Sequence, residues 1–245
     1  MTRTVLLNKD DHKHLRIDTR HSLELADKFG DEINACLTFV GELRSMQAHY
    51  PVFFQKDDAS GQLFPVALLG FEHGENLFLN DTCWDCPYIP ALIARQPFSI
   101  GKQQDPDSKD ERRVVHIDLD SPRVVGEEAE GEKLFLEFGG TTNYLQKMAD
   151  LLESIHEGME QNKLFSDALL EHDLVESFAL DVELQDGSQN QLVGYHTINE
   201  EKLYTLSAEQ LHALNEQGFL AAVYMMLASQ SQLSNLIARK NAQLD

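Results

Sequence analysis

Hydrophobic and polar positions follow two different periods along the chain, and the period changes near residue 141. Before this point, short apolar runs separated by turn residues predict β-strands, among them an antiparallel meander over 52–79. From Thr141 onward, apolar residues recur every three or four positions, as on one face of an α-helix. The pattern therefore predicts an α+β protein with a β-rich half, 1–140, and a helix-rich half, 141–245.

The β-rich half also contains elements outside the meander. Residues 33–40 read as a buried strand followed by a helical turn over 41–48, and residues 88–95 have helical spacing. The polar stretch 103–113 predicts an exposed loop, and the alternating residues 114–120 predict a strand after it.

The helix-rich half is expected to contain an inserted hairpin. Helices are predicted over 141–158 and 162–170, with Gly158 ending the first of them. Two alternating runs around Asp186–Gly187 predict the hairpin. Ser207 and Gln210 form a capping box that opens a helix, and one last helix is expected over 219–239.

Length and charge limit the classes of partner. A chain of 245 residues can form one large domain or two small ones, and we expect a single domain. It carries 41 acidic against 20 basic side chains, a formal net charge of −21. Such a chain repels phosphate backbones, so we do not expect it to bind nucleic acid. Acidity otherwise indicates solubility, and a basic protein partner or a cationic ligand is the alternative.

The compartment is expected to be the cytoplasm. The N-terminal residues contain no apolar run typical of a secretory signal, and no run approaches the ~18 residues that span a bilayer. The three cysteines, Cys36, Cys83 and Cys86, suit a reducing environment. Cys83 and Cys86 form a C-x-x-C pair without a second pair, and thiols in a protein core are the favoured interpretation.

Aromatic and arginine residues supply the first candidate site. Aromatic side chains with arginine are common on recognition surfaces, although aromatic residues beside proline also occur in cores. We expect a ligand or peptide groove, without a cofactor, formed by residues distant in sequence. These residues are His49, Tyr50, Trp84, Asp85, Tyr88, Arg95, Phe98 and Arg123.

A metal site is the alternative candidate. His116 and Asp118 form an H-x-D pair that strand alternation places on one face. With His196 they would make the two-histidine, one-carboxylate set of an Fe(II) oxygenase, and Arg123 would hold the carboxylate of a 2-oxoacid. The simpler interpretation is that His116 and Asp118 share a solvated strand face.

Many short motifs, in order, resemble the bacterial SapC-like family. In the first half they are 42–44, 50–54, 66–70, 75–78, Trp84, 88–90, 96–98 and 118–122. In the second half the segments 194–203 and 218–229 continue the resemblance, which covers nearly the whole chain. The family provides no catalytic motif that can be transferred to these residues.

The resemblance implies a functional setting rather than a reaction. Similar proteins are associated with TonB-dependent outer-membrane receptors and with cupin-like and tryptophan-halogenase-like proteins, which suggests nutrient uptake or peptide modification. We therefore expect an accessory protein that binds a partner such as a cupin-like or halogenase-like protein. A metal-dependent oxygenase and a protein associated with a surface layer are the alternatives.

Overall fold

The computed structural model describes residues 3–57, 59–104 and 111–244. Strands lie mainly in the first half of the chain and helices in the second, and the sheets are antiparallel, which confirms the α+β prediction. The chain divides into two compact units. Unit 1 comprises Met1–Asp31, Asp81–Cys83 and Ala91–Glu157, and unit 2 comprises the remaining segments. The two units interleave along the sequence. The expectation that the whole chain is one domain stays a prediction.

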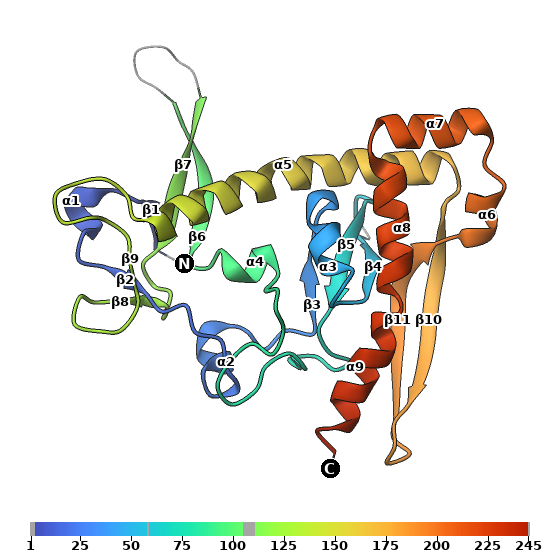
Figure 1. Ribbon diagram of the computed structural model, residues 1–245, viewed down its shortest axis with the longest axis horizontal. Helices are drawn as coiled ribbons and strands as arrows, with labels where there is room; N and C mark the ends of the chain where they lie inside the picture. Colours follow the sequence, from blue (N-terminus) through green and yellow to red (C-terminus); the bar gives the residue numbers. More distant parts are fainter. Residues whose placement is uncertain (1–2, 58, 105–110, 245) are drawn as a thin grey trace. The chain divides into compact units, whose positions relative to one another are not determined.

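Unit 1 contains two small sheets (Figure 1). The first has the order β1-β7-β6 and the second the order β8-β2-β9. The elements of unit 1 are β1 (Thr4–Leu6), α1 (Lys9–His12), β2 (Arg16–Ile17), α2 (Leu23–Phe29), α4 (Ala91–Ala94), β6 (Phe98–Gln104), β7 (Glu111–Asp118), β8 (Val124–Val125) and β9 (Glu132–Lys133).

The core of unit 1 joins these sheets to the first half of helix α5 (Asn143–Glu171). Fully buried side chains from β2, β6, β7 and the segment after β9 pack with two leucines of α5, and apolar burial of this kind is the main stabilising term. The buried residues are Ile17, Phe98, Ile117, Leu134, Leu145 and Leu152.

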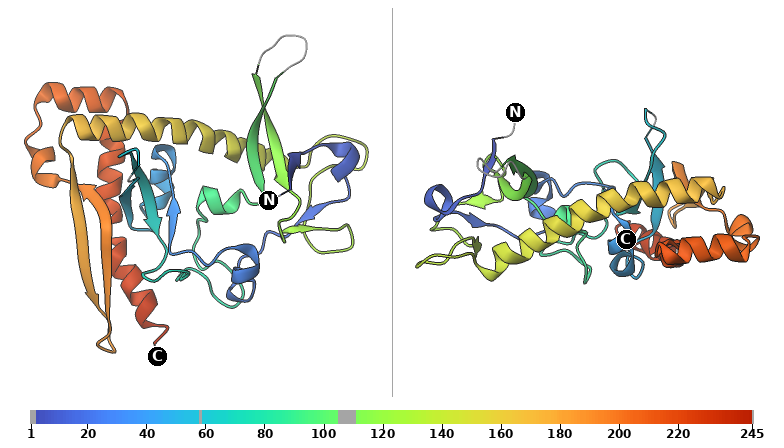
Figure 2. Two further views of the ribbon diagram at one scale, coloured as in Figure 1. Left: turned by 180° about the vertical axis from the view of Figure 1, so that it is seen from behind. Right: turned by 90° about the horizontal axis from the view of Figure 1, so that it is seen from above.

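Unit 2 is built on one five-stranded sheet of order β10-β11-β4-β5-β3, which Figure 2 shows from behind together with helix α8. Its strands are β3 (Ala35–Leu37), β4 (Val52–Lys56), β5 (Leu63–Leu68), β10 (Val175–Glu183) and β11 (Gln189–Ile198). Its helical elements are η1 (Val40–Glu42), α3 (Leu43–Met46), α6 (Glu200–Tyr204), α7 (Ala208–Glu216), α8 (Phe219–Ser229), α9 (Gln232–Asn241) and the second half of α5.

Aromatic packing fixes the helices of unit 2 on the sheet. The ring of Phe165 on α5 lies 6.0 Å from that of Phe54 on β4 and 5.3 Å from that of Phe219 on α8. The hydroxyl of Ser229, at the end of α8, accepts a hydrogen bond from the Val52 N–H at 3.0 Å. The core of this unit is therefore shared by the sheet, α5 and α8.

Several elements differ from the sequence-based expectation. The β4–β5 and β10–β11 hairpins and the Ser207 capping box are confirmed. The third strand of the meander is wrong, since 76–79 make only an isolated bridge between Leu79 and Trp84. The last helix is two helices, α8 and α9. Within the predicted loop 103–113, β6 extends to Gln104 and β7 begins at Glu111. Residues 105–110 lie outside the described residues.

Helix α5 continues through Gly158, where the sequence predicts an end. A Cβ atom on Gly158 would lie only 2.1 Å from Cδ2 of Phe39, so glycine at this position allows the Phe39 ring to pack directly on the helix backbone. Gly158 therefore marks a close approach within unit 2 rather than a helix end.

No helix in the described part of the chain combines the length and the apolarity that crossing a membrane requires.

Candidate functional site

The residues expected to form one ligand groove belong to both compact units. His49, Tyr50, Trp84, Asp85 and Tyr88 lie in unit 2, whereas Arg95, Phe98 and Arg123 lie in unit 1. The predicted residues of each unit have their own local environment.

Tyr50, Trp84 and Tyr88 do come together, but they form a hydrogen-bonded core cluster. The Tyr50 hydroxyl accepts a hydrogen bond from the Trp84 indole N–H at 2.9 Å and donates one to the Tyr88 carbonyl. The Tyr88 hydroxyl donates to the carboxylate of Glu42 at 2.9 Å. Tyr50 is 0% exposed, and burial raises its pKa far above the usual range. Within this cluster Tyr50 and Trp84 are buried and Tyr88 is half-buried, and its hydrogen bonds join separate segments of unit 2.

His49 and Asp85 lie beside this cluster. The His49 ring packs edge-on against Tyr50 at 6.2 Å between centroids. The Asp85 carboxylate accepts a hydrogen bond from Arg239 on α9 at 2.8 Å, and the guanidinium of Arg239 lies 4.6 Å from the ring centroid of Phe78. Asp85 therefore helps to anchor α9 through an ion pair with Arg239, and Phe78 adds a cation–π contact to the same guanidinium.

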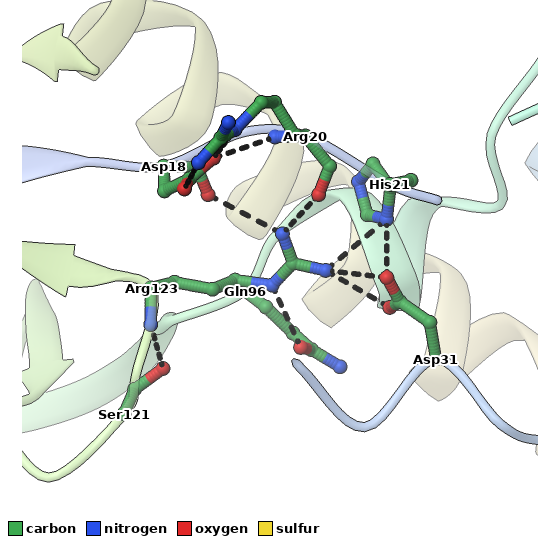
Figure 3. Close-up of polar contacts among 7 residues, drawn as sticks. All are labelled: Asp18, Arg20, His21, Asp31, Gln96, Ser121 and Arg123. Atoms are coloured by element: carbon green, nitrogen blue, oxygen red, sulfur yellow. Dashed lines mark hydrogen bonds and ion pairs between the residues drawn. The ribbon is translucent and has the colours of Figure 1, made fainter. Parts of the chain in front are cut away.

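Arg123 lies in a buried ionic network of unit 1 (Figure 3). Its Nη2 donates to both carboxylate oxygens of Asp31 at 2.9 and 2.8 Å, and its Nη1 donates to the Arg20 carbonyl at 2.9 Å. Nδ1 of His21 lies 2.8 Å from the Asp31 carboxylate. Arg123 is 1% exposed and Asp31 0%, so the expectation that Arg123 faces a ligand is not supported, because its guanidinium is fully engaged inside the unit.

The other two predicted site residues of unit 1 are also engaged locally. The guanidinium of Arg95 donates a hydrogen bond to the carbonyl of Phe98 at 2.6 Å, and the Phe98 side chain is completely buried. Phe98 packs 6.3 Å from the ring of Tyr144 on α5, between ring centroids. Phe98 is thus a core residue of unit 1 rather than part of a recognition surface.

The alternative metal ligands do not make a site. The described residues include no group of three or more His, Cys, Asp or Glu side chains arranged to hold a metal ion. The ring of His116 on β7 packs against Gly101, and Asp118 accepts a hydrogen bond from the Asp120 N–H at 3.1 Å. His196 lies on β11 of unit 2, where burial and the charge of Lys56 lower its pKa. A neighbouring lysine opposes the binding of a second cation.

A hollow that sequence reasoning missed lies in unit 1 beside β2 and β9. Its volume is about 560 Å³, within the range of small-molecule sites. Four cationic side chains line it, together with apolar side chains and two glutamates. The cations are Lys9, Lys13, Arg16 and Lys133; the other lining residues include His14, Leu15, Glu127, Phe135, Leu136, Glu137 and Thr142. We call this hollow the basic pocket.

None of the four cations of the basic pocket forms an ion pair within 4.0 Å in the described part of the chain. Of the two glutamates, Glu127 lies 2.7 Å from Nδ1 of His14. Among the described residues, no group accepts a hydrogen bond from the buried Nε–H of Arg16. A buried donor without a partner is unfavourable.

Strand pairing brings two of these cations together. β2 and β9 are antiparallel, and Arg16 is directly opposite Lys133. Like charges at directly opposite positions destabilise a β-ladder. A second hollow, of about 620 Å³, shares Arg16, Lys133 and Leu136 with the basic pocket. Arg16 and Lys133 therefore line both hollows.

The loop after β9 closes one side of the basic pocket. Its backbone turns back through the Leu136 N–H to Gly140 carbonyl hydrogen bond of 3.1 Å. Gly139 has a φ of +111°, and a Cβ atom there would lie 3.4 Å from Nζ of Lys9. The loop backbone therefore packs close to the Lys9 ammonium, which keeps this cation at the pocket wall.

A local signal for the basic pocket is present in the sequence. Residues 1–21 contain five Lys or Arg side chains against three Asp, an excess of two positive charges in a chain whose net charge is −21. Lys133 comes from a distant segment and reaches the pocket only through the pairing of β2 with β9. The net charge of the whole chain conceals this local excess.

Comparison with known proteins identifies the family but gives no activity. A family model described as SapC matches residues 7–236 of the 245 residues. No curated protein and no solved structure matches the chain. The match confirms the resemblance inferred from the short motifs, and the chain belongs to the SapC family.

Proposed function

We propose that this protein is an accessory binding protein whose basic pocket holds the anionic group of a ligand, a carboxylate or a phosphate. The observation that carries the proposal is the opposed pair of Arg16 and Lys133, which has no acidic partner among the described residues. An anion between them would convert a repulsive pair into two charge-assisted contacts.

The pocket suits binding better than acid–base chemistry. Its charged lining consists of lysine, arginine, glutamate and one histidine, His14, which is 63% exposed and lies beside Glu127. General acid–base catalysis needs a positioned group with a tuned pKa, usually in a desolvated site. Cations on a strand pair and a short helix instead provide complementary charge and donors for an anion.

The proposed function includes the setting that the family resemblance suggests, nutrient uptake or peptide modification. An accessory protein that presents or receives an anionic ligand is compatible with nutrient uptake or peptide modification, next to a cupin-like or halogenase-like partner. The oxygenase and surface-layer alternatives have no supporting observation among the described residues.

Calorimetric titration with inorganic phosphate at low ionic strength tests the proposal. We expect saturable binding at one site, weakened ~10-fold or more in Arg16→Gln and in Lys133→Gln, since each removes a charge-assisted contact. Lys147→Gln is the matched control, because Lys147 is an exposed lysine of unit 1 outside the pocket. Absence of saturable binding, or an equal loss in the control, would overturn the proposal.

A further inference from the structure

The apolar part of the basic pocket carries information about the rest of the ligand. The anionic group of a carboxylate or phosphate fills only a small part of a cavity of about 560 Å³. The remaining wall includes Leu15, Phe135 and Leu136. A pocket with a few convergent polar groups and an apolar wall is typical of a ligand that has an apolar portion.

Two apolar side chains of the loop after β9 are open to solvent. Leu136 is 53% exposed and lines both hollows. Phe138, two residues further along the same loop, is 97% exposed. Scattered exposed apolar residues are normal, but here two of them lie on the loop that closes a charged pocket. The loop therefore offers apolar surface next to the cations.

Resting on the anion-binding function proposed above, we infer that the ligand is a single-chain amphiphilic anion. Its charged head lies between Arg16 and Lys133, and its apolar chain lies along Leu136 toward Phe138. Arg16, Lys133 and Leu136 line both hollows, so the head and the chain would each contact this shared wall.

A monomeric amphiphile fits better than an anionic membrane surface. A net charge of −21 opposes approach of the whole protein to an anionic surface, and this repulsion acts over distances of the order of the Debye length. A single small anion that enters a local pocket experiences mainly the nearby cations. The four cations of the basic pocket, which form no ion pair within the described part of the chain, are therefore sufficient to attract a small anionic ligand.

Titration with phosphate monoesters of increasing chain length tests the inference. The probes are inorganic phosphate and butyl, hexyl and octyl phosphate, each below the concentration at which it forms micelles. We expect the affinity of the wild-type protein to rise about two- to fourfold for each methylene group that enters the pocket. Leu136→Ala and Phe138→Ala should each reduce this dependence on chain length.

Leu164→Ala is the matched control, since Leu164 is a leucine of unit 2 with 59% exposure. Equal affinity for inorganic and octyl phosphate would overturn the amphiphile and leave anion binding intact. No binding of any probe would overturn both. Co-flotation with vesicles of phosphatidylcholine and phosphatidylglycerol, lost in Phe138→Ala, would overturn the single-chain ligand in favour of a membrane surface. Absence of co-flotation supports it.

Discussion

Arg16 and Lys133 lie directly opposite each other across the β2–β9 ladder, although neither pairs with an acidic side chain among the described residues. A like-charged cross-strand pair reduces the stability of the folded protein, and in the same part of the chain the buried Nε–H of Arg16 has no acceptor. The positions that would bind an anion are thus unfavourable in its absence. Local features that lower the stability of the folded protein are expected at functional sites.

The first prediction concerns this conflict. Lys133→Gln should increase the free energy of unfolding by ~0.2–1 kcal/mol in chloride buffer of low ionic strength, because it removes the repulsion with Arg16. Urea unfolding measures this change, and Lys147→Gln should leave the stability nearly unchanged. A destabilised Lys133→Gln protein would show that Lys133 has a structural role instead.

The buried network of unit 1 gives a second prediction. Asp31→Ala leaves the guanidinium of Arg123 buried without its main partner, and should destabilise the protein by about 3–5 kcal/mol. The double variant Asp31→Leu/Arg123→Met removes both charges and should cost less than the sum of the single changes. Denaturant unfolding of Asp31→Leu, Arg123→Met and the double variant measures the coupling. Additive losses would mean that the two side chains act independently.

Close packing at Gly158 gives a third prediction. Glycine to alanine in a helix interior normally stabilises a protein by ~0.5–1 kcal/mol. Gly158→Ala should instead destabilise by about 1–3 kcal/mol, because the new methyl group overlaps the Phe39 ring. Phe39→Leu in the same chain should recover part of this loss. Thermal unfolding decides the matter, and a stabilised Gly158→Ala protein would contradict the packing described.

A fourth prediction follows from His196. Burial and the charge of Lys56 lower its pKa in the folded protein below the ordinary value of 6.5. As the pH falls through about 6.5, the unfolded chain takes up this proton first, so the free energy of unfolding decreases. His196→Gln should lose less stability between about pH 7.5 and about pH 5.5 than the wild-type protein. Equal acid sensitivity in both proteins would remove His196 as a cause.

Most of the fold follows from local patterns in the sequence. Alternation around Asp186–Gly187 predicts the β10–β11 hairpin, and the Ser207 capping box predicts the start of α7. These signals lie within a few residues of the elements they predict. The continuity of α5 could not be predicted in this way, because it depends on the packing of Phe39 against Gly158.

The candidate site was harder to predict because it also depends on contacts between residues that are distant in sequence. The sequence assigned Tyr50, Trp84 and Tyr88 to one candidate groove. In the structure, buried Tyr50 hydrogen-bonds with buried Trp84 and with the half-buried Tyr88, and composition does not distinguish such a cluster from a surface. The basic pocket depends on two strands of only two residues each, which are too short to show a period. Its cations become neighbours only after β2 pairs with β9.

The central claim, that an anion binds between Arg16 and Lys133, is tested most directly at the Arg16 Nε–H. Heteronuclear N–H NMR resolves arginine Nε–H groups, and the Arg16→Lys variant assigns this signal by its loss. Titration with inorganic phosphate should shift the Arg16 signal in a saturable way in the wild-type protein and much less in Lys133→Gln. If the Arg16 Nε–H signal does not move over the whole phosphate titration, no anion binds between Arg16 and Lys133.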